Sequence, residues 1–259
     1  MGRIFCLSKQ ETNYPEFGKI RTITILPVLT KLYELVLRQK LSSETKRLNY
    51  VPNCQLGFSS DTIGTQEHIM TIAKLMSKSR DRQKAYRASK TPVAERTKQW
   101  ILTIDFKSAF DKIDRNLLLD KMLRGGYDPA IVRAIGNLLS NTTVKYNGHV
   151  IPTERGCPQG SCISPDLWAI GMADLCRDLL NITSNESREK AVPCCFADDI
   201  LVFAHDRSQL TKAWRIIQEW SVQNKVPINL SKCEVMELRV DQRTPRTPFS
   251  PLVGIPLVS

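Results

Sequence analysis

A pair of adjacent aspartates between two apolar runs constrains the fold of this chain more than any other feature. Phe196-Ala197-Asp198-Asp199 follows Cys194-Cys195 and precedes an apolar run over 200–203. This pattern predicts two antiparallel strands joined by a tight turn that carries both carboxylates. Adjacent anions repel each other, so a chain that keeps such a pair usually offers it to a divalent metal. Because Asp is also a common turn residue, the turn taken alone fits an ordinary acidic hairpin equally well.

Hydrophobic periodicity and turn signals predict the other elements. The first hundred residues are predicted to hold a strand over 20–25, helices over 29–41 and 65–79, and a polar, basic loop over 80–99. The remainder is predicted to hold a strand over 101–104, helices beginning near 114, 129 and 164, hairpins over 144–151 and at the paired acids, a helix over 208–223 and a strand near 234–240. The predicted order in this part is strand, helix, hairpin, helix and strand. This order is typical of the split βαβ, ferredoxin-like plan, which is an α+β fold with an antiparallel sheet.

Charge is distributed unevenly along the chain. Residues 1–100 hold 18 Lys and Arg against 8 Asp and Glu, whereas residues 101–259 hold 19 against 18, and the net charge is +11. The basic half suits an anionic partner, most simply a nucleic-acid backbone. A solvated surface rich in Lys and Arg is the plainer alternative, and for the loop over 80–99 the two alternatives stay equally open.

The composition excludes several classes of protein. No apolar run reaches the roughly 20 residues that cross a bilayer, and the first nine residues lead into no apolar core of a secretory signal. The 8 cysteines show no C-x-x-C spacing and no matching histidines. We therefore expect free thiols, no structural zinc, and an intracellular protein of the nucleus or cytoplasm that is not secreted and has no membrane partner.

A third carboxylate, Asp105, follows the apolar strand predicted over 101–104. In a split βαβ sheet this strand and the acidic hairpin can be central neighbours, so Asp105, Asp198 and Asp199 are predicted to converge. A cluster of hard oxygen ligands suits Mg²⁺ or Mn²⁺. Two such ions can activate an attacking hydroxyl and stabilise a leaving pyrophosphate in phosphoryl transfer.

Further segments follow one another in a set order around these acids. They are residues 25–34, 55–58, 105–111 (DFKSAFD), 156–165 (GCPQGSCISP), 196–199 (FADD), 229–232 (NLSK) and 252–254 (LVG). The last five resemble motifs A, B, C and D and the primer grip of reverse transcriptases, and the first two are similar to the fingers of non-LTR (LINE-like) retrotransposon enzymes. The resemblance extends over about residues 7–255. It implies an RNA-directed DNA polymerase that uses two Mg²⁺ or Mn²⁺ ions, an RNA template, a DNA primer and deoxynucleotides.

The resemblance also assigns roles to single residues. Asp105 and Asp198 would be the main metal ligands, with Asp199 close by, and Lys232 would protonate the leaving pyrophosphate. Around the incoming nucleotide, the ring of Phe110 would exclude a ribose 2′-hydroxyl, and the remaining nucleotide contacts would come from Gln159, Gly160 and, at the triphosphate, Arg21. Lys9 and Lys31 match basic positions of the fingers and would contact nucleic acid, and Arg80, Arg82 and Lys84 of the basic loop are candidates for the same contacts by their charge alone. From the residues alone, Phe110 also fits a core ring, Gln159 and Gly160 a turn, and Lys232 a solvated lysine.

The resemblance further implies a right-hand polymerase architecture. Residues 1–100 would be the fingers, 101–245 the catalytic palm, and 246–259 the start of the primer-grip region, with no thumb following.

Two alternatives stay open beside this interpretation. Thr22 and Ser59-Ser60 depart from the Pro and the basic residue that the family commonly has there. These departures suit an inactive or truncated polymerase-derived fragment that only binds nucleic acid. An RNA-directed RNA polymerase shares the palm and the paired acids, but Phe110 argues against it because its ring would exclude ribonucleotides.

Overall fold

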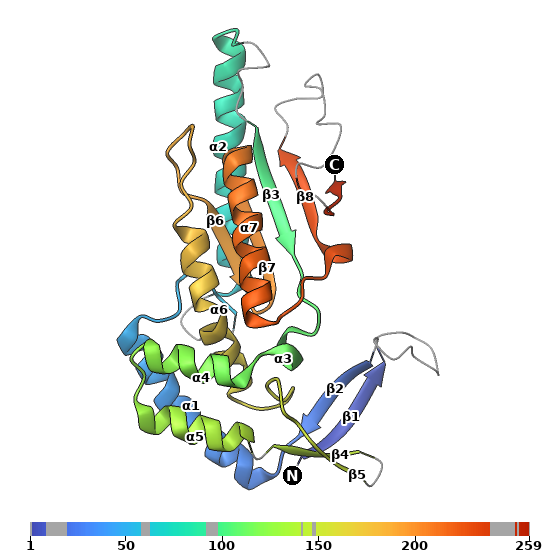
Figure 1. Cartoon of the computed structure of the whole chain (residues 1–259). Helices are drawn as coiled ribbons and strands as arrows, with labels where there is room; N and C mark the ends of the chain where they lie inside the picture. Colours follow the sequence, from blue (N-terminus) through green and yellow to red (C-terminus); the bar gives the residue numbers. More distant parts are fainter. Residues whose placement is uncertain are drawn as a thin grey trace. The chain divides into compact units, whose positions relative to one another are not determined.

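The computed structural model describes residues 2–8, 20–57, 63–91, 98–140, 142–146, 149–238, 252 and 254–258, with the backbone alone for 2–8, 20–22, 144–146, 151 and 258. The chain forms two compact units, each assembled from separate stretches of sequence (Figure 1). The first unit holds residues 1–51, 108–172 and 224–226, and the second holds 52–107, 173–223 and 227–259.

The first unit contains a four-stranded sheet in the order β2-β1-β4-β5. The strands are β1 (Gly2–Ser8), β2 (Ile20–Ile25), β4 (Thr143–Tyr146) and β5 (His149–Pro152). β4 and β5 pair antiparallel, which confirms the predicted hairpin, while its turn at 147–148 lies outside the described residues. β1 pairs antiparallel with β2 and parallel with β4, and it was not predicted because residues 2–8 lack a clear alternation.

The helices of the first unit are α1 (Val28–Leu48), α3 (Ala109–Lys112), α4 (Arg115–Arg124), α5 (Pro129–Ser140) and the first half of α6 (Ser164–Leu180). Three of them begin where they were predicted, near residues 114, 129 and 164, whereas α1 continues seven residues past its predicted end at 41 and α3 was not predicted. The Asp114 carboxylate accepts hydrogen bonds from the backbone amides of residues 116 and 117. The Asp128 carboxylate accepts one from the amide of residue 130 at 2.7 Å. Both aspartates satisfy amides that would otherwise be unpaired at the helix start.

Gly136 lies inside α5, where glycine is a poor helix former. A Cβ added at this position would lie 3.3 Å from Cδ1 of Leu119, which is the far end of a partly exposed side chain. We therefore expect Gly136→Ala to raise the free energy of unfolding by about 0.5–1 kcal/mol. Urea unfolding of the two proteins checks this, and a lower midpoint for the variant would show that Leu119 cannot yield.

The second unit contains a five-stranded sheet in the order β6-β7-β3-β8-β9. The strands are β3 (Gln99–Ile104), β6 (Val192–Phe196), β7 (Asp199–Ala204), β8 (Glu234–Leu238) and β9 (Leu257–Val258). β3 runs antiparallel to β7 and β8, and β6 runs antiparallel to β7. The four strands β6, β7, β3 and β8 therefore have the predicted split βαβ order. A fifth strand, β9, is added parallel to β8.

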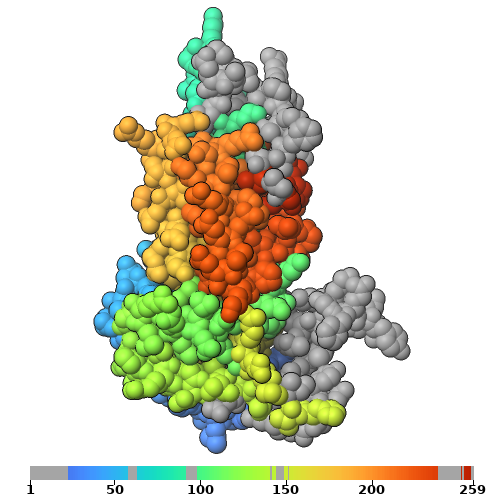
Figure 2. Space-filling model, viewed as in Figure 1, coloured from blue at the N-terminus to red at the C-terminus, as the bar shows by residue number. Residues whose placement is uncertain are grey.

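Two long helices pack against this sheet. Figure 1 shows α7 (Arg207–Asn224) across one face and α2 (Thr65–Ala88) along the other. α7 buries an apolar stripe at helical spacing, and its polar side lies at the surface of the unit, coloured orange in Figure 2. The buried stripe consists of Leu210, Ala213, Trp214, Ile217 and Trp220.

The predicted loop over 80–99 is wrong for its first nine residues. α2 continues through Arg80, Arg82 and Lys84 to Ala88. Residues 80–88 contain no Gly or Pro, and Arg, Gln, Lys and Ala are strong helix formers. Lys84 also pairs with Asp81 at 3.3 Å, one helical turn away. The polar composition therefore reflects a solvated helix, and residues 92–97 lie outside the described part of the chain.

Within the described ranges, no helix combines the length and the apolar character needed to cross a membrane.

Candidate active site

The three predicted carboxylates lie at one end of the central strands of the second unit. β3 pairs with β7 as far as Ile104 opposite Ile200. One residue further in the same register, Asp105 comes opposite Asp199, the first residue of β7, and Asp198 precedes it in the turn. Asp105 and Asp198 are partly buried, and Asp199 is exposed. The structure thus brings the predicted acids to the same edge of the sheet.

The segment 229–232 holds the Asp105 carboxylate. The Asn229 side-chain amide donates to Oδ2 of Asp105 at 2.8 Å, and the Asn229 backbone amide donates to the Asp105 carbonyl at 2.8 Å. Nζ of Lys232 lies 3.7 Å from Oδ1 of Asp105. Lys232 is therefore placed beside Asp105. Asn229 orients the carboxylate, a role that the sequence did not predict because nothing local shows which residue its amide reaches.

The turn between β6 and β7 is held by the side chain of Gln55. Ala197 adopts a left-handed backbone with φ 55°, which is rare for a residue with a Cβ. Oε1 of Gln55 accepts hydrogen bonds from the amides of Ala197 and Gly57, and Nε2 of Gln55 donates to the Ala197 carbonyl, all at 3.0 Å. Gln55 is 4% exposed. Gln55 belongs to a segment that resembles the fingers, and nothing in that segment predicts its contact with the turn that carries Asp198.

Gly57 lies against the same turn. A Cβ on Gly57 would lie 2.2 Å from the backbone nitrogen of Ala197, a distance that the backbone cannot accept without moving. The segment 54–57 also pairs with β6, because the Cys195 amide donates to the Cys54 carbonyl and the Leu56 amide donates to the Cys195 carbonyl. Residues 54–57 therefore hold the acidic turn in two ways. Their backbone pairs with β6, and the Gln55 side chain bonds to Ala197.

The carboxylates fit a divalent cation by their chemistry. Asp105, Asp198 and Asp199 supply only hard oxygen donors, which Mg²⁺ and Mn²⁺ prefer. Their oxygens do not all lie within 4.8 Å of one another, since among the described residues only three cysteine thiols form so close a group of metal-ligating side chains. The acids therefore share an edge of the sheet without forming a closed ligand set.

Phe110 and Gln159, which were predicted to contact the incoming nucleotide, both lie in the first unit. Phe110 packs against Trp168 with ring centroids 5.3 Å apart. Nε2 of Gln159 donates to both carboxylate oxygens of Asp111, at 3.1 and 3.2 Å. The structure thus joins the segment after Asp105 to the loop that carries Gln159. It also shows that Phe110 contacts a core ring, which was the alternative drawn from the residues alone.

The loop containing Gly160 lies against β2. The Thr24 amide donates to the Gln159 carbonyl at 2.7 Å. Gly160 has φ +114°, and a Cβ there would lie 2.3 Å from the Thr24 carbonyl oxygen. Glycine is therefore required here both by the backbone conformation and by the close approach of a strand.

Arg115 fixes the start of the same loop from inside the first unit. Its guanidinium donates to the carbonyl oxygens of residues 139, 153, 155 and 156 and to the Thr153 hydroxyl. Burial lowers the pKa of Arg115 from its usual value. Arg115 was not predicted as a structural residue, since an Arg in the first turn of a helix gives no sign that it is buried.

The predicted nucleic-acid contacts lie on helices or outside the described residues. Lys31 is exposed on α1, and Arg80 is exposed on α2. Arg82 pairs with Glu189 at 2.9 Å, and Lys84 pairs with Asp81. Arg21 belongs to β2, of which only the backbone is described at that position, and Lys9 lies outside the described residues.

Comparison with known proteins gives the same family as the motifs. The model of the family described as "Reverse transcriptase (RNA-dependent DNA polymerase)" matches residues 8–247. The chain is 25% identical over 224 residues to the RNA-directed DNA polymerase from mobile element jockey of Drosophila funebris, covering 82% of this chain and 23% of that protein. The jockey polymerase of Drosophila melanogaster is 23% identical over 241 residues, covering 89% of this chain and 24% of that protein. The chain therefore spans about a quarter of the length of these two relatives.

Solved structures with a similar fold include telomerases. Telomerase from Candida tropicalis, in complex with a fragment of telomeric RNA, has a TM-score of 0.62 at 13% identity. The match covers 91% of this chain and 41% of the telomerase chain. Telomerase from Candida albicans has a TM-score of 0.56 at 15% identity, with 95% and 43% covered. At this identity the likeness concerns the fold alone. Because the family model matches nearly the whole chain, this protein belongs to the reverse transcriptase (RNA-dependent DNA polymerase) family.

Proposed function

We propose that this chain is the RNA-directed DNA polymerase domain of a non-LTR retrotransposon protein. It adds deoxynucleotides to the 3′-hydroxyl of a DNA primer on an RNA template. The observation that carries the proposal is the arrangement of Asp105 opposite Asp199 at the end of β3 and β7, with Asp198 beside them. Membership of the reverse transcriptase family supports the same reaction.

The acids at this edge would hold two Mg²⁺ or Mn²⁺ ions, with Asp105 and Asp198 as the main ligands and Asp199 close by. When bound, such ions activate the attacking hydroxyl and stabilise the charge of the leaving pyrophosphate. Asn229 keeps the Asp105 carboxylate in one orientation through its 2.8 Å hydrogen bond. Lys232, an exposed ammonium beside Asp105, donates a proton to the pyrophosphate as it leaves.

Other residues act on the nucleotide and on the template. Phe110 rejects the ribose 2′-hydroxyl, Gln159 and Gly160 lie against the incoming nucleotide and template, and Arg21 binds the triphosphate. Residues 1–100 act as the fingers, 101–245 as the palm, and 246–259 belong to the primer-grip region of an intracellular protein. Contacts to the backbones of template and primer come from Lys9, Lys31, Arg80, Arg82 and Lys84.

Primer extension on an RNA template tests this function. The chain is incubated with a labelled DNA primer, Mg²⁺ and deoxynucleotides, with and without the RNA template. We expect elongation that requires both the template and the divalent cation. RNA binding that weakens steeply with salt, without any elongation, would instead identify a polymerase-derived binding protein. Elongation with ribonucleotides only would identify an RNA-directed RNA polymerase.

Sugar selection gives a separate prediction. Phe110→Val removes the ring but keeps a β-branched apolar side chain against Trp168. We expect the ratio of ribonucleotide to deoxynucleotide addition to rise at least about tenfold, because the repulsive contact with the 2′-hydroxyl is lost. The ratio is measured within one protein, so a loss of folded molecules does not change it. An unchanged ratio would remove Phe110 from sugar selection.

A further inference from the structure

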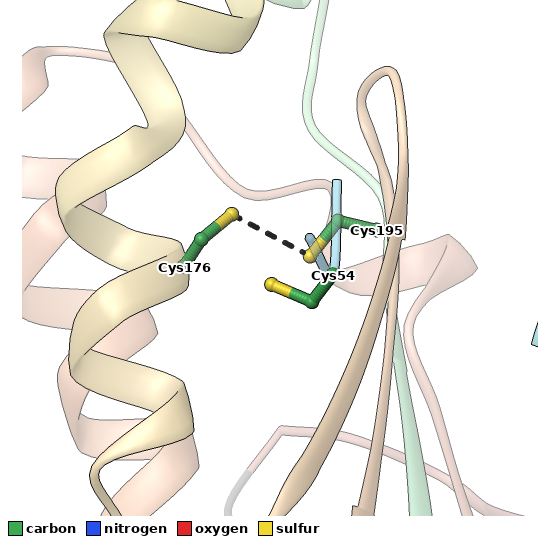
Figure 3. Close-up of side chains that lie close together, drawn as sticks. All are labelled: Cys54, Cys176 and Cys195. Atoms are coloured by element: carbon green, nitrogen blue, oxygen red, sulfur yellow. Dashed lines mark hydrogen bonds between the residues drawn. The ribbon is translucent and has the colours of Figure 1, made fainter. Parts of the chain in front are cut away.

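Three cysteines that are far apart in the sequence meet inside the second unit. Cys54 precedes the Gln55 clamp, Cys176 lies on α6, and Cys195 lies on β6. Their sulfur atoms all lie within 4.8 Å of one another. Figure 3 shows the three side chains pointing toward a common centre from a helix, a strand and the segment beside that strand. Cys54 is 9% exposed, and Cys176 and Cys195 are fully buried.

The spacing of the sulfurs fits ligation of one ion. Zinc bound by thiolates has bonds of about 2.3 Å in a tetrahedron, so two sulfurs on one ion lie roughly 3.8 Å apart. Sγ of Cys176 and Sγ of Cys195 are 3.8 Å apart. Contact between two packed thiols gives a similar distance for one pair, because buried Cys also behaves as a small apolar residue. A metal site needs a third sulfur close to both of these, whereas packing of thiols does not require one.

A histidine contacts the backbone of one of these cysteines. His68 on α2 has its Nε2 atom 3.0 Å from the Cys195 carbonyl oxygen. Zinc commonly takes three sulfurs and one imidazole nitrogen as a closed structural set. Among the described residues only the three sulfurs lie within 4.8 Å of one another, so the His68 ring would have to turn toward them to bind the same ion.

We propose that Cys54, Cys176 and Cys195 bind one thiophilic divalent cation, for which Zn²⁺ is the reference probe, at a site distinct from the three carboxylates. Sulfur ligands select such an ion over Mg²⁺, which prefers oxygen. Each ligating thiol releases one proton as its sulfur bonds to the ion. His68 would take the fourth position only after its ring turns away from the Cys195 carbonyl oxygen.

The bound ion would connect the elements that support the acidic turn. Cys54 is next to Gln55, whose amide holds Ala197, and Cys195 lies on β6 three residues before Asp198. A cation between them would join this segment, the strand and α6, and would stabilise the folded unit because it binds only where all three meet. The inference concerns a structural site and does not depend on polymerase activity.

Metal content tests the proposal, with a neighbouring cysteine as the control. The protein is equilibrated with Zn²⁺ in the presence of excess Mg²⁺, passed through a desalting column, and analysed for zinc per chain. We expect one zinc ion per chain and a rise in the unfolding temperature with Zn²⁺. A variant with Cys54→Ala, Cys176→Ala and Cys195→Ala should lose both. Cys194→Ala should keep both, because Cys194 is buried but its side chain lies on the opposite face of β6.

A second measurement needs no variant, in case the triple variant does not fold. Co²⁺ added to the unaltered protein should give the absorption bands of sulfur-to-cobalt charge transfer, and Zn²⁺ should remove them. Folded protein without these bands and without retained zinc would overturn the proposal, as would equal zinc content in the folded triple variant. Neither readout involves nucleotide addition, so their failure is distinguishable from failure of the proposed polymerase function.

Discussion

Asp105→Asn is expected to lower the rate of RNA-templated nucleotide addition by about a thousandfold or more. Asparagine keeps the shape of the side chain but removes the negative charge that a divalent cation requires. The substitution leaves the backbone bond between residues 229 and 105 in place, so the sheet edge should keep its fold. Single-turnover addition of one deoxynucleotide, at saturating primer and template, measures this loss separately from binding.

Asp120→Asn is the matched control for this experiment. Asp120 also forms an ion pair, with Arg124 on α4, but the Arg124 side chain is largely exposed and that of Asp120 about half exposed. Solvent screens such a pair, so its loss changes stability little. This variant should therefore add nucleotides at the unaltered rate. A rate for Asp105→Asn within tenfold of the unaltered protein would contradict a role for Asp105 as a main metal ligand.

Gln55→Leu is expected to lower the free energy of unfolding by about 3 kcal/mol or more. The substitution leaves the Ala197 amide and carbonyl and the Gly57 amide without their present partner. Each buried polar group that loses its hydrogen bond costs about 1–3 kcal/mol. The left-handed backbone of Ala197 also loses the contacts that hold it, so the turn that carries Asp198 should shift and nucleotide addition should fall.

Urea unfolding and nucleotide addition, measured on the same samples, check this expectation. Ala197→Gly is the informative control, because it keeps all three bonds of Gln55 and removes the cost of a left-handed residue with a Cβ. We expect this control to unfold at a urea concentration equal to or above that of the unaltered protein. Unfolding of Gln55→Leu at the unaltered midpoint would show that the amide does not hold the turn.

The sequence predicted the elements that local patterns specify. The acidic hairpin was visible because apolar runs flank two adjacent acids, and the position of Asp105 followed from an apolar strand that ends at a carboxylate. Asp114 and Asp128 were recognisable as helix starts, since capping depends on residues within one turn. Once the strands pair in the split βαβ order, the acids must reach the same edge of the sheet.

The contacts that support the site could not be predicted from local patterns. The side chain of Gln55 reaches a turn more than a hundred residues away, and that of Asn229 reaches Asp105. The cysteine cluster also joins three distant segments, so spacing along the chain gave no sign of it. The basic stretch after residue 79 was misassigned for another reason, because a solvated helix and a loop have similar polar compositions.

The most direct test of the central claim is to locate divalent cations in the complete complex. A crystal of the chain with an RNA template, a primer lacking its 3′-hydroxyl, the next deoxynucleotide and Mn²⁺ would reveal the ions by their anomalous scattering. The account predicts manganese in contact with the carboxylates of Asp105 and Asp198 and with the triphosphate. A bound triphosphate whose manganese ions contact neither carboxylate would contradict it.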